Sequence, residues 1–190
     1  EDDFVAFAMA YSASVIADSI EGSFWAGTTA TSGQFNGITT SYSGSMTASS
    51  ASGAYTAANI IANMGTLVAD IPSAVYGKDD LYIYMNKKAY RFYISAISAL
   101  SAFPFNNMGE YTRQFEGINI AVVPGLADNI MYAGTKSNLF FGTSTQLDMD
   151  FNEVSVLDMK PLDGSQNIRL VARWTAGVQV GVAADFTYQS

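Results

Sequence analysis

The stretch DLYIYMNKKAYRFYISAISAL, residues 80–100, changes its hydrophobic period halfway along. In its first part Leu81, Ile83 and Met85 alternate with tyrosines, and a period of two predicts a β-strand. In its second part apolar residues recur three and four positions apart, which predicts a helix. The residues expected on the inner face of that helix are Tyr90, Ile94, Ile97 and Leu100. A strand that runs directly into a helix is thus the centre from which the rest of the chain can be interpreted.

The segments on either side of this stretch predict further regular structure. Upstream, residues 57–69 are expected to form a helix, with Thr56 as its N-cap. Downstream, FPFNNMGE (residues 103–110) predicts a loop. Residues 115–123 (FEGINIAVV) and 129–134 (NIMYAG) are then expected to form two strands joined by the turn PGLAD, and NLFFGT follows as a short apolar segment.

The N-terminal part predicts an amphipathic helix. Asp2 and Asp3 favour the positive end of a helix dipole, and the helix is expected to run to about Trp25 and stop near Gly27. Its apolar residues, three and four positions apart, are Phe4, Phe7, Ala8, Tyr11, Val15 and Ile16. Residues 27–53 are rich in Ser, Thr and Gly and predict a long loop with one apolar island, FNGI. That loop is either a flexible linker or a segment ordered by neighbouring subunits.

From Asn152 onward the pattern predicts strands, with PLDGSQ as a turn between them. The residues expected on one face of the returning strand are Ile168, Leu170, Ala172 and Trp174, and bends are expected at Gly177 and Gly181. The chain would then end in a long antiparallel hairpin. Because helices and strands do not alternate strictly, the order of elements predicts an α+β fold rather than a doubly wound parallel sheet.

The composition favours a subunit that hides part of its surface. Of 190 residues, 49% are hydrophobic and only 14% are charged, so a sizeable core is expected with few charges outside it. The formal net charge of −8 argues against a general nucleic-acid binder. Lys87, Lys88 and Arg91 form the one basic cluster, which at helical spacing is expected to be a solvated face or a subunit contact. No apolar run is long enough to span a bilayer.

The acidic stretch DMDFNEVSVLD, residues 148–158, is the best candidate for chemistry, and its pattern is incomplete. A calcium loop of the EF-hand type needs Gly where Glu153 stands and Glu where Met159 stands. A looser cation site is left open, and the simpler interpretation is the polar start of a strand. The chain has no Cys and no His, which removes thiolate nucleophiles, His-based triads and the usual zinc sites. We therefore expect no enzyme, no cofactor and no metal.

Five stretches in order carry a resemblance to a known family. They are IADSIEGSFWAG (16–27), FNGI (35–38), the helix–strand–helix of residues 59–93, the strands and turn of residues 117–143, and the hairpin of residues 152–188. In this order and spacing the chain resembles the major capsid proteins of tailed phages, with the Hong Kong 97-type fold. With features such as the Glu-Gly pair near the end of the first helix, the chain is most similar to capsid proteins of crAss-like and other Bacteroidetes phages.

The resemblance implies an α+β fold with two lobes. A peripheral domain of residues 1–53 and 144–184 would hold the long spine helix and the β-hairpin, and an axial domain of residues 54–143 and 185–190 would hold a mixed sheet flanked by helices. The return of the chain would place Phe186 and Tyr188 in the axial domain. The N-terminal arm and extended loop that the family has before its spine helix lack counterparts in this chain, so no family crosslink can be assigned to it.

The resemblance also implies a function and partners. The chain would be a structural subunit of an icosahedral capsid that self-assembles into pentamers and hexamers around double-stranded DNA. Further partners would be the portal, scaffold or protease of the same phage, with DNA contacted only indirectly and no membrane. The protein would be located in the virion, after assembly in the host cytoplasm. Residues 103–110 or the turn 124–128 would lie near a five- or six-fold axis. The candidate interface residues are Phe24, Trp25, Phe105, Asn106, Asn107, Met108, Asp148, Asp150 and Glu153.

Two rival hypotheses remain open at the level of sequence. The Ser/Thr/Gly-rich loops and tyrosine-rich strands also suit a secreted carbohydrate-binding or adhesin module, which would line one groove with exposed aromatic residues. The acids around Asp148 would suit a calcium-dependent hydrolase. A capsid subunit would instead keep its aromatic residues in the core or at subunit seams.

Overall fold

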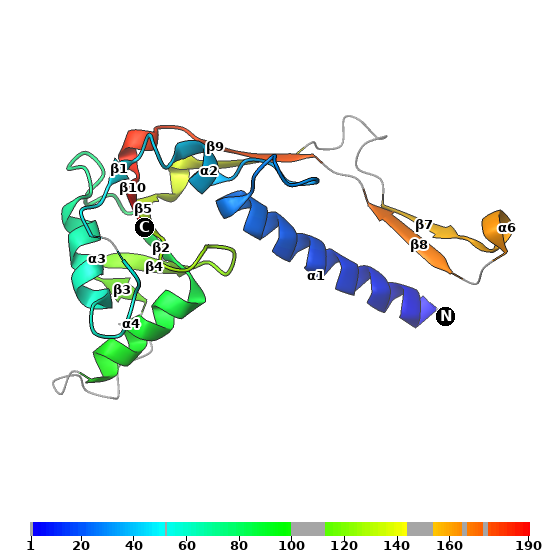
Figure 1. Ribbon diagram of the computed structural model, residues 1–190, viewed down its shortest axis with the longest axis horizontal. Coiled ribbons are helices and arrows are strands. Elements are labelled where there is room, and N and C mark those ends of the chain that lie inside the picture. The colour runs from blue at the N-terminus through cyan, green and yellow to red at the C-terminus, as the bar shows by residue number, and fades with distance from the viewer. Residues whose placement is uncertain (1, 52, 100–112, 144–153, 165–166, 173–174) are drawn as a thin grey trace.

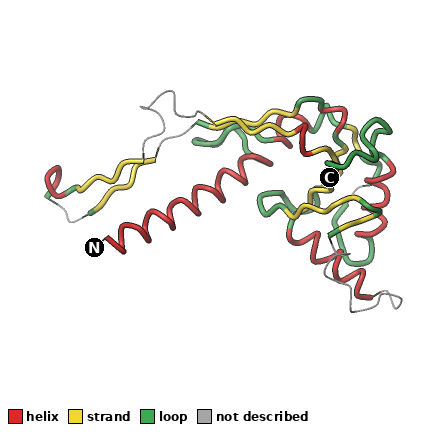
Figure 2. The backbone as a smooth tube through the Cα atoms, turned by 180° about the vertical axis from the view of Figure 1, so that it is seen from behind, coloured by secondary structure: helices red, strands yellow, loops and turns green. Residues whose placement is uncertain are grey.

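The computed structural model describes residues 2–51, 53–99, 113–143, 154–164, 167–172 and 175–190. A body built on a six-stranded sheet carries two long extensions, the helix α1 (Asp2–Ala26) and the ladder of β7 (Val154–Asp158) with β8 (Ile168–Ala172) (Figure 1). The N-terminal end of α1 and the far end of the β7–β8 ladder both lie away from the body (Figure 2). The mixture of helices with a mixed sheet confirms the predicted α+β class.

The sheet is organised around β2 (Leu81–Met85), the strand predicted from the opening stretch. β2 pairs in parallel with β4 (Ile118–Val122) and antiparallel with β5 (Met131–Thr135). The strands on either side of the turn PGLAD therefore do not pair with each other, because β2 lies between them. The full order is β1 (Thr47–Ala48), β10 (Thr187–Gln189), β5, β2, β4 and β3 (Gln114–Phe115).

The expectation of one strand over residues 115–123 is wrong. Glu116 and Gly117 both have positive φ, at 49° and 81°, and form a two-residue turn in which Phe115 pairs with Ile118. Positive φ at both central positions is the geometry of the type I′ hairpin turn, which matches the twist of the flanking strands. The turn adds the short edge strand β3 to the sheet.

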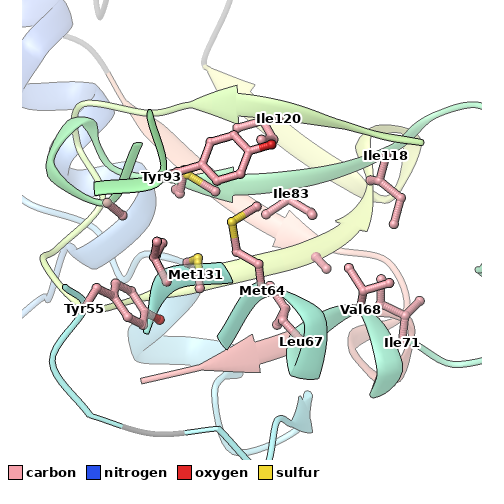
Figure 3. Packing of buried hydrophobic residues seen from close by; sticks show 14 of the residues in the cluster. Tyr55, Met64, Leu67, Val68, Ile71, Ile83, Tyr93, Ile118, Ile120 and Met131 are labelled. Atoms are coloured by element: carbon pink, nitrogen blue, oxygen red, sulfur yellow. The ribbon is translucent and has the colours of Figure 1, made fainter. Parts of the chain in front are cut away.

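One face of the sheet is covered by α3 (Ile60–Ala69) and α4 (Lys87–Ala99). The main hydrophobic core lies between the sheet and these two helices (Figure 3). The helix expected from residue 57 begins three residues later, at Ile60. In the turn before it, Asn59 Oδ1 accepts hydrogen bonds from the backbone N–H and hydroxyl of Thr56. The inner face of α4 is also rotated from the prediction. Its buried residues are Ala89, Tyr93, Ala96 and Ile97, whereas Tyr90 and Ile94 are half-buried and Leu100 lies outside the described residues.

The other face of the sheet carries a second, more aromatic cluster. Its buried members are Trp25, Ile38, Met46, Tyr84, Leu126, Tyr132, Val180 and Phe186. Ile38 begins the short helix α2 (Ile38–Tyr42), so the segment expected as a loop contains both a helix and the strand β1. Tyr188 pairs with Tyr132 of β5 and Phe186 is fully buried in this cluster, and the placement of both in an axial domain stays a prediction.

Two successive two-stranded ladders form the C-terminal hairpin. β6 (Leu139–Thr143) pairs with β9 (Ala176–Val180) next to the body, between the 3-10 turns Lys136–Asn138 and Ala183–Asp185. β7 and β8 pair farther out, with the helical turn α6 (Lys160–Asp163) beside them (Figure 2). Gly177 is paired with Gly142 inside the ladder, so the bend expected there is wrong. Trp174 lies outside the described residues. Within the described residues no helix is both long and apolar enough to cross a membrane.

Candidate functional site

The end of α1 is joined to the body by an aromatic cluster. The Trp25 side chain is only 4% exposed, and its ring lies 5.4 Å from that of Tyr84 and 5.7 Å from that of Tyr132. The Tyr132 hydroxyl lies 2.6 Å from Thr39 Oγ1, which ties α2 to the same cluster. Burial raises the pKa of the Tyr84 and Tyr132 hydroxyls, so both stay neutral at ordinary pH. Trp25, expected at a subunit interface, is thus packed inside its own chain.

Close backbone contacts make this joint tight. Gly37 N donates to Gly27 O at 2.9 Å, and a Cβ added to Gly37 would lie 2.5 Å from Ser23 O. A Cβ on Gly125 would lie 2.7 Å from the Glu21 carbonyl, because the turn 124–128 packs directly against the helix. Such distances leave no room for a side chain, so the sequence requires glycine there. The direction in which α1 leaves the body is therefore fixed by backbone packing.

The turn 124–128 also contacts the start of α4. The Asp128 carboxylate accepts hydrogen bonds from Lys88 Nζ at 2.8 Å and Asn86 Nδ2 at 2.5 Å. The hydrogen bond from Lys88, together with its charge and the Asn86 amide, lowers the pKa of Asp128. Leu126 is buried in the aromatic cluster. The turn thus connects α1 with α4, and its position near a symmetry axis stays a prediction.

Beyond this joint, α1 leaves large apolar side chains uncovered. Phe7 is 68% exposed and Tyr11 is 64% exposed, and Val15 and Met9 are also exposed. Phe7, Tyr11 and Val15 belong to the apolar stripe that the sequence predicts. Met9 lies on another side of the helix, so the exposed apolar residues are not confined to one face and the expectation of an amphipathic helix is not confirmed.

A second uncovered apolar surface lies at the corner of the β6–β9 ladder. Phe140 and Val182 are 54% and 52% exposed, and Phe141, on the opposite face of β6, is also exposed. The half-buried Phe24 ring lies 6.0 Å from that of Phe141, so Phe24 contacts the chain's own ladder. This surface was not predicted from the sequence. Two consecutive phenylalanines in a strand necessarily place one on each face, and that signal was available in NLFFGT.

Two of the described carboxylates, those of Asp70 and Asp80, accept hydrogen bonds from serine residues. Asp70 accepts from the Ser50 backbone N–H and from the hydroxyls of Ser49 and Ser50, and the backbone hydrogen bond is the main cause of its lowered pKa. Asp80 binds the hydroxyl of Ser137, which lowers its pKa in the same way. Among the described residues, no three Asp or Glu side chains gather as a metal site would need. Asp70 and Asp80 therefore hold neighbouring loop segments in place through hydrogen bonds.

The remaining candidate interface residues lie outside the part of the chain that the structure describes. They are Phe105, Asn106, Asn107, Met108, Asp148, Asp150 and Glu153. Of the basic cluster, Lys88 forms the ion pair with Asp128, and Lys87 and Arg91 are exposed on α4. Within the described residues, the candidate site consists of the packing surfaces around the end of α1, the turn 124–128 and the β6–β9 ladder.

The comparisons with known proteins concern the fold. No protein-family model and no curated protein matches the chain. Among solved structures, the capsid of an empty GTA particle matches 98% of this chain with a TM-score of 0.70 and 17% identity. A structure of Mycobacterium phage Che8 matches 97% with a TM-score of 0.55 and 11% identity, and the satellite phage P4 procapsid matches 69% with a TM-score of 0.52 and 11% identity.

This chain spans only part of each of those proteins. It covers 66% of the GTA capsid chain, 60% of the Che8 chain and 37% of the P4 procapsid chain. At such identities the likeness concerns the fold alone, and it extends over almost the whole of the present sequence. The chain therefore has the fold that these capsid structures share, as the sequence predicted.

Proposed function

We propose that this chain is a structural subunit of a bacteriophage-type icosahedral capsid of the Hong Kong 97 type. It would self-assemble into pentamers and hexamers that enclose double-stranded DNA. The observation that carries the proposal is the shared fold over 98% of the chain. The uncovered apolar residues of α1 and the β6–β9 corner support it, because large exposed apolar patches in a soluble chain usually mark protein interfaces.

The finer assignments belong to the same proposal. α1 and the two ladders would form the peripheral domain, and the six-stranded sheet with α3 and α4 the axial domain. The portal, scaffold or protease of the same phage would be further partners, and the P4 structure contains a size determination protein. The net charge of −8 suits a shell that encloses DNA without adhering to it. Assembly in the host cytoplasm and an origin in a crAss-like or other Bacteroidetes phage complete the proposal.

The distribution of aromatic residues favours a shell subunit over a carbohydrate-binding module. A binding module would expose its aromatic rings along one groove. Here Trp25, Tyr132 and Phe186 are buried in the core of the subunit. The exposed rings of Phe7 and Tyr11 lie on α1, and that of Phe140 lies on the distant corner of the β6–β9 ladder. Surfaces of this kind suit subunit seams better than a sugar site.

Electron microscopy of the expressed full-length protein tests the proposal. Closed shells or five- and six-membered rings are expected, and analytical ultracentrifugation should show the same species in solution. A variant with charges on the exposed stripe, Phe7→Asp with Tyr11→Asp, should stay soluble and fail to assemble. A native protein that remains a strict monomer at all concentrations, or that binds sugars as a monomer, would contradict the proposal.

A further inference from the structure

We propose that the pair Asn36–Gly37 is a site of spontaneous deamidation, and that it reacts only when the joint at the C-terminal end of α1 opens. Asparagine is a thermolabile residue. Asn36 is the one asparagine of the sequence that a glycine follows, and it is exposed. Glycine leaves its own backbone nitrogen the most accessible, because it has no Cβ. The inference concerns the lifetime of the subunit and does not depend on the proposed function.

The reaction needs only water and the two residues themselves. The Gly37 backbone nitrogen loses its proton and attacks Asn36 Cγ, which closes a succinimide ring and breaks the bond from Cγ to the amide nitrogen. That nitrogen takes up the proton and leaves as ammonia. Water then opens the ring. Opening at Cγ gives aspartate, and opening at the backbone carbonyl carbon of residue 36 gives isoaspartate, in which the backbone runs through the side chain.

In the folded chain both reacting groups are held by hydrogen bonds. Asn36 Oδ1 accepts from Thr29 N at 2.9 Å, and Gly37 N donates to Gly27 O at 2.9 Å. Gly37 is buried although Asn36 is exposed, so its N–H is shielded from the base in solvent that must remove the proton. Ring closure would also turn Gly37 N away from Gly27 O. The succinimide can therefore form only after these contacts have broken.

Breaking these contacts requires the joint itself to open. Gly27 O also accepts from Thr40 Oγ1 at 2.7 Å, which fastens α2 to the same carbonyl. A Cβ added to Gly37 would lie 2.5 Å from Ser23 O, so the backbone at residue 37 already touches the last turns of α1. Its neighbour Ile38 is only 1% exposed. Gly37 cannot move without separating α2 from α1, so the rate of deamidation in the native protein should measure how often this joint opens.

The two products would affect the joint differently. Aspartate keeps an acceptor oxygen for Thr29 N and leaves the course of the backbone unchanged. Isoaspartate adds a backbone atom before Gly37, at a place where even a Cβ does not fit. Gly37 N could then no longer reach Gly27 O while Ile38 stays buried. Isoaspartate would thus weaken the joint permanently after a single opening.

Peptide mapping by mass spectrometry tests the protection. The full-length protein is aged in mildly alkaline buffer, once folded and once in guanidinium, and the conversion of Asn36 is followed with time. Conversion should be at least about tenfold slower in the folded protein, because only its open fraction reacts. Equal rates in the two states would overturn the inference, and so would an absence of conversion in the unfolded chain.

A pair of threonine variants tests whether the joint, rather than the whole fold, controls the reaction. Thr40→Val removes the hydrogen bond to Gly27 O and should speed conversion in the folded protein about threefold or more. Thr66→Val is the matched control, because it removes a hydrogen bond of the same kind, to Ala62 O within α3, and should leave the rate unchanged. Equal acceleration by both variants, or no acceleration by Thr40→Val, would overturn control by the joint.

Refolding tests the consequence for the joint. Asn36→Asp should refold to the stability of the native chain, because the acceptor oxygen and the backbone are kept. Chains that carry isoaspartate after ageing in guanidinium should refold with a lower free energy of unfolding. Isoaspartate chains that regain the native stability would overturn the inferred damage to the joint.

Discussion

Leu67 of α3 and Phe7 of α1 are both large apolar residues on regular helices, yet Leu67 is completely buried and Phe7 is 68% exposed. The difference follows from their surroundings. α3 packs on the sheet of its own chain, whereas the first turns of α1 extend away from the body (Figure 1). Large apolar residues are therefore covered by the chain itself in one region and left exposed in the other. Five predictions test this division between a self-sufficient body and an incomplete extension.

The largest effect is expected from Leu67→Ala. Removing a fully buried leucine deletes apolar contacts and leaves a cavity, so the free energy of unfolding should fall by about 2–5 kcal/mol. Urea unfolding of the unassembled subunit measures this. A loss below about 1 kcal/mol would mean that the body is not closely packed around α3.

The next effect concerns the joint between the two regions. Gly125→Ala should destabilise the subunit by about 1–3 kcal/mol, because the added Cβ would meet the backbone of Glu21 at 2.7 Å. Gly65→Ala is the matched control, since it lies inside α3 with no atom within 4 Å of the added Cβ. That control should raise stability by about 0.5–1 kcal/mol through helix propensity. Equal effects of the two changes would contradict the tight joint.

A buried amide in the body offers a stabilising change. Gln189 is 1% exposed, and neither side-chain atom has a hydrogen-bond partner among the described residues. Replacing it by methionine, which is similar in size and needs no partner, should raise the free energy of unfolding by about 1 kcal/mol. Thermal and urea unfolding would show the gain. Destabilisation by Gln189→Met would instead mean that the amide is satisfied in the native protein.

The hydrogen bonds from Ser49 and Ser50 to the Asp70 carboxylate predict that the stability of the subunit depends on pH. Its carboxylate accepts three hydrogen bonds in the folded state, which lower its pKa below the ordinary value. The stabilisation is therefore complete above about pH 4 and is lost as the pH falls through the folded pKa. Asp70→Asn should reduce the slope of stability against pH in this acidic range, and Ser50→Ala should reduce it partly. If neither variant changes the slope of stability against pH, these hydrogen bonds do not stabilise the folded state.

The smallest effect on the unassembled subunit is expected from Phe7→Ala. Because its side chain has little packing to lose, the free energy of unfolding should change by less than about 0.5 kcal/mol. Assembly, followed by sedimentation, should weaken strongly for the same variant. An effect on the lone subunit as large as that of Leu67→Ala would show that α1 is covered within its own chain.

Local patterns allowed much of the body to be predicted from the sequence. The switch of period at residues 80–100 gave both β2 and α4, because alternation and helical spacing are local signals. The buried face of α4 lies about one residue away from the face predicted from the sequence. The small Ala89 and Ala96 face inward where α4 packs closely, while the larger Tyr90 and Ile94 remain half-buried, and this preference depends on tertiary packing.

Other features could not be predicted because they depend on distant parts of the chain. Trp25 looked like an interface residue, and only the positions of Tyr84 and Tyr132 show that it is internal. The exposure of the apolar residues of α1 could not be predicted either, because periodicity does not say whether the chain itself covers them. The two-residue turn at Glu116 and Gly117 was hidden inside an apparently continuous strand pattern.

The place of β10 in the sheet has a consequence for how the protein is made. β10 lies between β1 and β5, so Thr47 enters the sheet only by pairing with Thr187. A nascent chain would therefore carry an unfinished sheet, with Tyr132 lacking its neighbour Tyr188, until residues 187–189 leave the ribosome. Closing a contact across most of the sequence is slow compared with local helix formation. The body would consequently finish folding only after residues 187–189 have been made, which would delay association between less complete chains on the same messenger RNA.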